Sequence, residues 1–177
     1  MSVKPINIGV VGVGHLGIHH VKHYTTIPNV NLLGIYDPDV KRSNYVSKKY
    51  KTIAFQSLKK LIQNVDALSI VTPTPNHYKT AKLCIENKKH VFIEKPITVN
   101  LEEATKLLDL SKNNSTIIQV GHIERLNPAL MALDPYYINP KFIEIQRLAP
   151  YTVRGTDVPV VLDKMIHDID ILLSLVK

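Results

Sequence analysis

Six short apolar runs, separated by longer amphipathic segments, constrain the fold of this chain more than any other feature. Such runs are typical of strands that are covered on both faces of a sheet. Strands that alternate with helices are joined by right-handed crossovers and form a parallel, doubly wound sheet, so the chain is predicted to have an α/β fold. The predicted strands are Ile6–Val11, Val30–Tyr36, Thr52–Phe55, Asp66–Val71, His90–Ile93 and Thr116–Val120. The predicted helices between them are His15–Thr26, Asp39–Tyr50, Leu58–Gln63, His77–Asn87 and Leu101–Asn113.

The pattern changes after Gly121. Helices are predicted at Leu126–Leu133 and Val158–Val176, and alternating apolar and polar residues predict a half-buried strand at Lys141–Leu148. One strand does not make a sheet. We therefore expect two domains: the doubly wound domain at residues 1–121, and an incomplete α+β domain at residues 122–177.

Composition and charge exclude several classes of protein. A chain of 177 residues, 45% of them hydrophobic, can bury a core without disulfides or metals. Its single cysteine, Cys84, fits a reducing compartment, and no apolar run reaches the ~20 residues of a membrane span. The net charge of +7 comes from scattered lysine pairs, which are typical of a solvated surface. We expect a cytoplasmic protein without a signal peptide, and neither a nucleic-acid nor a membrane partner.

The first predicted strand runs directly into a glycine-rich turn of the form G-x-G-x-x-G. In this position the first glycine allows a tight turn, the second lets the backbone approach a pyrophosphate, and the third lets the helix pack on the strand. The N-terminus of the following helix offers N–H groups and a partial positive charge to the phosphates. The turn therefore predicts a dinucleotide site in a Rossmann domain. Its residues are Gly12, Val13, Gly14, His15, Leu16 and Gly17.

Asp37 adds the second part of this prediction. It stands at the end of the second predicted strand, twenty residues after Gly17. An acid in that place accepts hydrogen bonds from the adenosine ribose and repels a 2′-phosphate. NAD is therefore the expected cofactor, with NADP disfavoured. Lys41 and Arg42 lie close by in sequence and weaken that preference.

Five motifs in order along the chain resemble one family, the Gfo/Idh/MocA oxidoreductases (glucose–fructose oxidoreductase and inositol dehydrogenase). The amino-acid sequence around the last two motifs is most similar to the branch of the family that acts on nucleotide sugars. Members of this family are about twice as long as this chain, so the resemblance also implies that the second domain is truncated. The motifs are the glycine turn extended to His20, Thr72-Pro73-Thr74-Pro75-Asn76-His77, Glu94-Lys95-Pro96, Gly121 to Pro128 (GHIERLNP), and Asp163 to His167 (DKMIH).

The resemblance also implies roles for individual residues. Lys95 is expected to polarise the reacting hydroxyl from the end of a central strand, before a cis peptide bond to Pro96. His167 is expected to accept the hydroxyl proton, because the pKa of histidine lies near neutrality, and Asp163 to orient its ring. The further cofactor-binding residues implied are Thr72, Pro73, His77, Glu94, Lys95 and Pro96.

Duller interpretations exist for the same residues. Asp163 and His167 are four apart and could be a surface ion pair, or with Asp170 a metal site, but three convergent ligands are not evident and no metal is expected. Arg125 could bind a substrate diphosphate, together with Arg147 and Arg154, or could tie the domains together.

The predicted function is NAD-dependent oxidation of a secondary hydroxyl of a sugar, namely a nucleotide-linked amino sugar such as UDP-N-acetylglucosamine. The alternative is a truncated, catalytically inactive NAD-binding remnant, or one half of a split enzyme. A strand near residues 141–148 and the apolar residues of Ile169–Val176 would be left uncovered. They predict association with a second copy or with a complementing chain.

Overall fold

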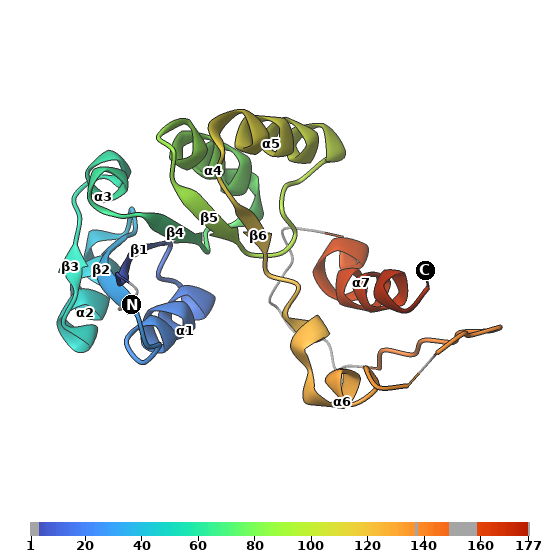
Figure 1. Cartoon of the computed structure of the whole chain (residues 1–177). Helices are drawn as coiled ribbons and strands as arrows, with labels where there is room; N and C mark the ends of the chain where they lie inside the picture. The colour runs from blue at the N-terminus through green and yellow to red at the C-terminus, as the bar shows by residue number, and fades with distance from the viewer. Residues whose placement is uncertain (1–3, 137, 149–158, 177) are drawn as a thin grey trace. The chain divides into compact units, whose positions relative to one another are not determined.

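The computed structural model describes residues 4–136, 138–148 and 159–176. The chain divides into two compact units, Met1–Val120 and Gly121–Lys177. Figure 1 shows the elements of both, and each unit is described here by itself.

The first unit is built on a six-stranded parallel sheet with the order β3-β2-β1-β4-β5-β6. The chain fills one half of the sheet outward from β1 and then the other half outward from β4, so β1 and β4 lie side by side at the point where the strand order reverses. Open α/β sheets bind ligands at the carboxyl ends of the strands at such a point. The predicted parallel, doubly wound sheet is confirmed. The strands are β1 Ile6–Val11, β2 Val30–Tyr36, β3 Ile53–Ala54, β4 Ala67–Ile70, β5 His90–Ile93 and β6 Ile118–Val120.

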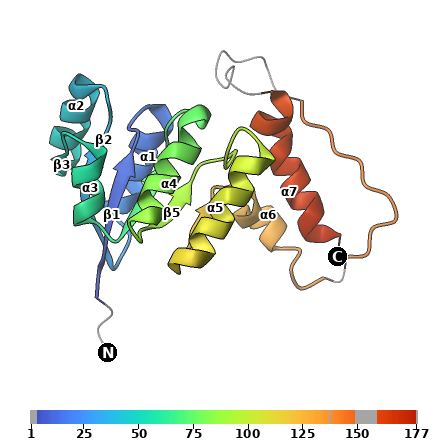
Figure 2. The same ribbon diagram turned by 90° about the horizontal axis from the view of Figure 1, so that it is seen from above.

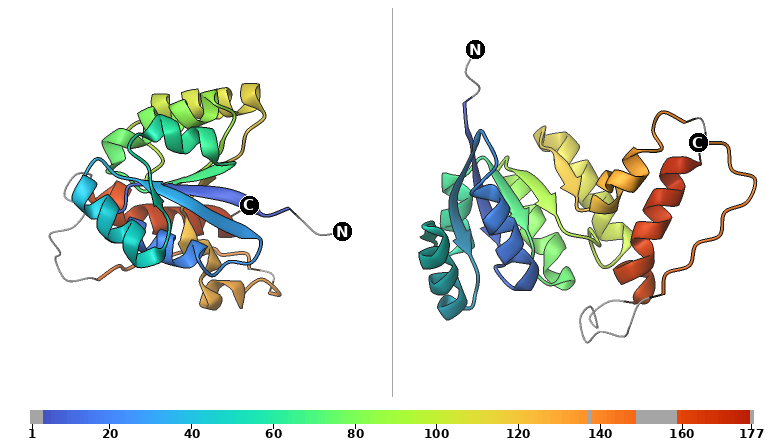
Figure 3. Two further views of the ribbon diagram at one scale, coloured as in Figure 1. Left: turned by 90° about the vertical axis from the view of Figure 1, so that its left-hand side faces the viewer. Right: turned by 90° about the horizontal axis from the view of Figure 1, so that it is seen from below.

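Helices cover both faces of this sheet. Helices α1 and α2 lie on one face, and α3, α4 and α5 lie on the other (Figure 3). Each face has its own core: Val10, Val21 and Ile35 belong to the first, whereas Leu68 and Ile85 belong to the second. Helices α4 and α5 pack against each other along the second face (Figure 2). The helices are α1 His15–Tyr24, α2 Val40–Tyr50, α3 Leu58–Asn64, α4 His77–Glu86 and α5 Leu101–Asn114, with a short 3-10 helix, η1, at Thr74–Asn76.

The second unit is helical in the part that the structure describes. Its elements are the 3-10 helix η2 Ile123–Leu126, α6 Pro128–Met131, the π-helix η3 Val161–Met165 and α7 Ile166–Leu175. The single helix predicted over Leu126–Leu133 is wrong, because Asn127 adopts an extended conformation before Pro128 and caps α6 by accepting a hydrogen bond from the Ala129 N–H at 3.0 Å.

The strand predicted at Lys141–Leu148 is also wrong. A strand needs a neighbour for its hydrogen bonds, and residues 141–148 have none among the described residues of this unit. Apolar side chains of the segment are exposed, with Phe142 82% and Leu148 92% accessible. The alternating residues would be half-buried only against a neighbouring element, and the described part of the unit provides none. No helix within the described ranges is both long and apolar enough to cross a membrane.

Candidate active site

The glycine turn after β1 is shaped by two close backbone approaches. Gly12 has φ +86°, and a Cβ there would meet the Val71 carbonyl oxygen at 2.6 Å. A Cβ at Gly17 would lie 2.0 Å from the Gly12 carbonyl oxygen. Both positions therefore need glycine for reasons of backbone geometry. The turn is tied to β2 by the Gly12 N–H, which donates to the Tyr36 carbonyl at 2.8 Å.

Gly14 differs from the other two, because its missing side chain leaves open space. A Cβ there would have no atom within 4 Å. Gly14 is the N-cap of α1, no side chain caps the helix, and its first turn carries no acid. The first-turn N–H groups of a helix have no acceptor within the helix, and with the helix dipole they favour an anion. An open cradle at a positive helix end is the arrangement that a pyrophosphate requires, so these residues fit a dinucleotide.

Asp37 holds the glycine turn by a hydrogen bond, and it stands at the end of β2, where the adenosine ribose is expected. Its Oδ2 accepts a hydrogen bond from the Val13 N–H at 2.8 Å, its Oδ1 accepts one from the Asp39 N–H at 2.9 Å, and the residue is 7% exposed. The half-exposed Arg42 guanidinium lies 3.8 Å from the Asp37 carboxylate and 3.4 Å from that of Asp39. The positive charge beside Asp37, expected from the sequence, is therefore present.

Lys95 follows β5 at the carboxyl edge of the sheet. The Lys95–Pro96 peptide bond is cis, as the resemblance implies. Glu94, which precedes it, does not extend into open solvent. Its Oε1 pairs with His20 Nε2 at 3.0 Å, and its Oε2 accepts a weaker hydrogen bond from the Lys95 N–H at 3.3 Å. Any cofactor contact of this carboxylate would therefore compete with contacts inside the protein.

His77, expected beside the cofactor, is 1% exposed. Its Nδ1 lies 2.9 Å from the Pro96 carbonyl oxygen and its Nε2 lies 2.8 Å from the Thr72 carbonyl oxygen. The imidazole thus joins the loop after β4, which continues into Pro73, to the turn after β5. It can influence a bound cofactor only through the backbone that it holds.

In the second unit, Asp163 and His167 lie on either side of a change in helix type. Asp163 belongs to the π-helix η3, and His167 is the second residue of α7, which follows directly. Both side chains are partly buried. Single π turns inside helices are frequent at functional sites. The described residues contain no cluster of three or more ligands that could hold a metal ion.

The two described arginines proposed for a diphosphate are bound to carboxylates instead. Arg125 Nε and Nη2 each donate to Asp170 at 2.6 Å, and the Arg147 guanidinium donates to Asp168 at 2.6–3.0 Å. The hydrogen bonds from these guanidinium groups hold the pKa of each aspartate below its usual value. Both members of the Arg125–Asp170 pair belong to the second unit, where they join η2 to α7. Arg154 lies outside the described residues.

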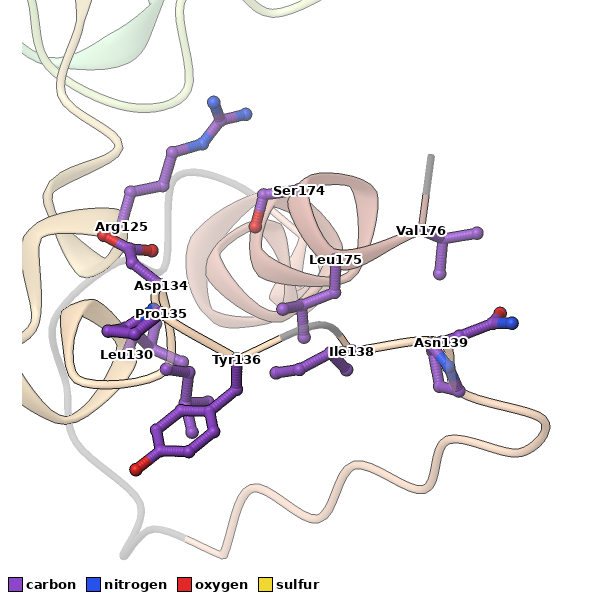
Figure 4. Close-up of a pocket in the computed structure, with 12 residues that line it drawn as sticks. Arg125, Leu130, Asp134, Pro135, Tyr136, Ile138, Asn139, Ser174, Leu175 and Val176 are labelled. Carbon is purple, nitrogen blue, oxygen red and sulfur yellow. The ribbon is translucent and has the colours of Figure 1, made fainter.

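A pocket of about 670 Å³ in the second unit lies away from His167. It is lined by residues around Tyr136 and by Ser174–Val176 at the far end of α7 from His167. In Figure 4 the Arg125 side chain points away from Tyr136, in keeping with its bond to Asp170. The titratable residues that line the pocket are Arg125, Asp134 and Tyr136, and neither Asp163 nor His167 is among its lining residues.

Sequence reasoning missed the residues that hold Glu94. The sequence indicated His20 only as the last residue of the extended glycine motif, and it did not indicate Ser69 of β4. His20 Nδ1 lies 2.8 Å from Ser69 Oγ, and the centroid of the Tyr24 ring lies 6.4 Å from that of the His20 ring. Burial is the main cause that raises the pKa of Tyr24. The available signal was the spacing, since His20 is one helical turn beyond Gly17 and Ser69 interrupts an apolar strand.

A doubly wound sheet, an open glycine cradle at its switch point and an acid at the end of β2 define a dinucleotide-binding Rossmann domain. Comparison with known proteins assigns this domain to one family. The sequence profile described as the oxidoreductase family, NAD-binding Rossmann fold (GFO_IDH_MocA), matches residues 6–122. The chain belongs to this family.

Several of the similar proteins are dehydrogenases that act on sugars or inositols. UDP-N-acetylglucosamine 3-dehydrogenase of Acidithiobacillus ferrooxidans is 39% identical over 168 residues, which are 94% of this chain and 53% of that protein. A solved structure of that enzyme gives a TM-score of 0.93 at 37% identity, covering 98% of this chain and 57% of that one. The NAD(+)-dependent scyllo-inositol 2-dehydrogenase of Bacillus subtilis is 33% identical over 130 residues, 70% of this chain and 37% of that protein. This chain thus spans about half the length, or less, of these relatives.

Proposed function

We propose that this chain binds NAD through its first unit and serves in the oxidation of a secondary hydroxyl of a nucleotide-linked amino sugar such as UDP-N-acetylglucosamine. The observation that carries the proposal is the open cradle at Gly14, which lies at the same edge of the sheet as Lys95. The substrate class is supported by the 39% identity to a UDP-N-acetylglucosamine 3-dehydrogenase over 94% of this chain.

NAD is proposed over NADP because of Asp37. A carboxylate at the end of β2 accepts hydrogen bonds from ribose hydroxyls and disfavours a 2′-phosphate. Arg42, 3.8 Å from that carboxylate, is half-exposed and reduces the repulsion. We therefore expect a preference for NAD that is moderate in size.

Three side chains carry the proposed chemistry. When bound, NAD supplies the hydride acceptor. The Lys95 ammonium stabilises negative charge on the reacting hydroxyl oxygen. The His167 imidazole accepts the proton of that hydroxyl, and Asp163 orients the imidazole.

A second candidate function is a dinucleotide-binding module without turnover. It is favoured by the second unit, whose described residues form helices but no strand, and leave Leu173 65% exposed. In that case the chain would either be an inactive remnant or need another chain to complete the substrate site.

Turnover separates the two candidates. The purified chain is mixed with NAD and UDP-N-acetylglucosamine, and in parallel with scyllo-inositol, while NADH absorbance is followed. We expect NADH with the nucleotide sugar, a large loss of rate in Lys95→Ala and His167→Gln, and an NAD affinity within a few-fold of wild type in Lys95→Ala. The matched control is Lys79→Ala, which removes an exposed lysine of α4. NAD binding without NADH from any sugar would support the module instead.

A further inference from the structure

The turn formed by Glu94, Lys95 and Pro96 is attached to helices on both faces of the sheet. Helix α1 covers one face, and its His20 contacts the Glu94 side chain. Helix α4 covers the other face, and its His77 contacts the Pro96 carbonyl oxygen. Lys95 lies between these two attachments in the sequence.

On the α1 face the attachment is a directed chain of hydrogen bonds. Ser69 is fully buried, and its Oγ lies 2.8 Å from His20 Nδ1. A serine hydroxyl that donates to Nδ1 leaves Nε2 as the ring nitrogen that carries the proton of His20. His20 Nε2–H then donates to the Glu94 carboxylate at 3.0 Å. In this order Ser69 and His20 each donate to the next group along the chain of hydrogen bonds.

Packing keeps this chain of hydrogen bonds in place. The His20 side chain is 19% exposed, that of Glu94 is 14% exposed, and the His20 ring lies 5.5 Å from the ring of Phe92 on β5. Hydrogen bonds to a carboxylate in such partly buried surroundings are stronger than those between neutral groups. The Glu94 carboxylate is thus fixed, and with it the acceptor of the Lys95 N–H.

On the α4 face the attachment is a single buried imidazole. Both of its ring nitrogens face carbonyl oxygens, those of Pro96 and Thr72, at 2.9 and 2.8 Å. Carbonyl oxygens only accept hydrogen bonds, and a neutral imidazole has only one N–H to donate. The ring nitrogen of His77 that carries the proton therefore donates to one of these two oxygens, and the ring lies between both.

We propose that His20 and His77 are positioning residues, which hold the turn from opposite faces of the sheet and so fix the place from which the Lys95 ammonium acts. His20 does this through its contact with the Glu94 carboxylate, and His77 through its contacts with the Pro96 and Thr72 carbonyl oxygens. That Lys95 acts on a sugar hydroxyl rests on the proposed function, whereas the attachment of the turn does not. Misplacing a reacting group by about 1 Å can cost about a hundredfold in rate.

The first test is ring-nitrogen NMR of the wild-type chain labelled at histidine. We expect a proton on His20 Nε2, and a His77 ring N–H that exchanges slowly with solvent because it is held by a carbonyl oxygen. A His20 protonated only at Nδ1, or a His77 ring N–H that exchanges freely with solvent, would overturn these two attachments.

The second test uses paired variants, His20→Leu with His20→Gln and His77→Leu with His77→Gln. The glutamines keep one donor, and the leucines keep none. The matched control is His90→Leu, at the opposite end of β5, where His90 Nδ1 accepts a hydrogen bond from the Ile117 N–H at 3.0 Å.

Two measurements are made on each variant. Amide hydrogen exchange at Lys95 should be about tenfold faster in both leucine variants, as expected for the loss of one hydrogen bond, and should recover in the glutamines. Turnover should fall about a hundredfold in the leucine variants while NAD affinity stays within a few-fold. Exchange at Lys95 no faster in His20→Leu and His77→Leu than in His90→Leu would refute the proposal. If the wild-type chain shows no turnover, the proposed function fails, but the exchange and NMR results still decide whether the turn is held as proposed.

Discussion

Replacing Gly14 by alanine should weaken NAD binding without weakening the fold. The added Cβ would have no atom within 4 Å, and the backbone there, with φ −67° and ψ −159°, suits alanine. Glycine-to-alanine changes in a compatible conformation raise the free energy of unfolding by about 0.4–1 kcal/mol. Gly14 is also the N-cap of α1, where alanine is less favourable than glycine, so this gain is offset. The methyl group would instead occupy the space beside the α1 N-terminus where a phosphate oxygen accepts hydrogen bonds.

The size of the loss follows from the hydrogen bond that the methyl group displaces. A hydrogen bond to a charged group contributes about 1.5–3 kcal/mol, so NAD affinity should fall about 10- to 150-fold. Isothermal titration calorimetry gives the affinity, and urea denaturation gives the free energy of unfolding. Affinity should therefore fall in this variant while the free energy of unfolding stays within about 1 kcal/mol of the wild type.

Gly17→Ala is the matched comparison for this experiment. Its Cβ would lie 2.0 Å from the Gly12 carbonyl oxygen, so the backbone must shift. Overpacking of this kind costs about 1–3 kcal/mol. We expect this variant to lose stability and affinity together. NAD affinity in Gly14→Ala equal to that of the wild type would refute the placement of the pyrophosphate at this cradle.

Two further outcomes are expected. Asp37→Asn should weaken the binding of NAD by about tenfold and that of NADP by less, because it removes the charge that repels a 2′-phosphate. Calorimetry with both cofactors measures the two affinities. Equal losses would show that Asp37 does not contact the ribose. In the second unit, the lowered pKa of Asp170 means that its pairing with Arg125 stabilises the fold fully above the unfolded pKa of about 3.9, and that this contribution is lost as pH falls through the lower folded value. Since the Arg125 side chain is 53% exposed, the contribution of this pair to the free energy of unfolding is about 1 kcal/mol. The NMR signals of α7, followed as the pH is lowered, should report this loss of stability in the wild type and not in Asp170→Asn.

The sequence predicts the first unit well because local and long-range signals agree there. Apolar runs such as Ile6–Val11 and Val30–Tyr36 have the composition of buried strands, and Gly12 stands where a positive φ is needed. The second unit is harder, because its alternating segment at 141–148 finds no partner strand among the described residues. A period of two indicates a side-chain pattern, but the ladder depends on a neighbour.

Within the candidate site, sequence reasoning finds residue types more readily than their partners. The acid at Asp37 was predicted from its position, but its bond to the Val13 N–H was not. The His20–Glu94 pair joins residues 74 positions apart, so the local sequence pattern does not predict it. Arg125 had two interpretations, a diphosphate ligand or a tie between the domains, and neither names its bidentate contact with Asp170 of the same unit.

The most direct test of the central claim is calorimetric titration of the purified 177-residue chain with NAD and, separately, with NADP. The open cradle at Gly14 and the carboxylate of Asp37 predict saturable binding of NAD, with NADP weaker. A folded sample that binds neither cofactor would contradict the account, since its first unit would then have the Rossmann fold without the site.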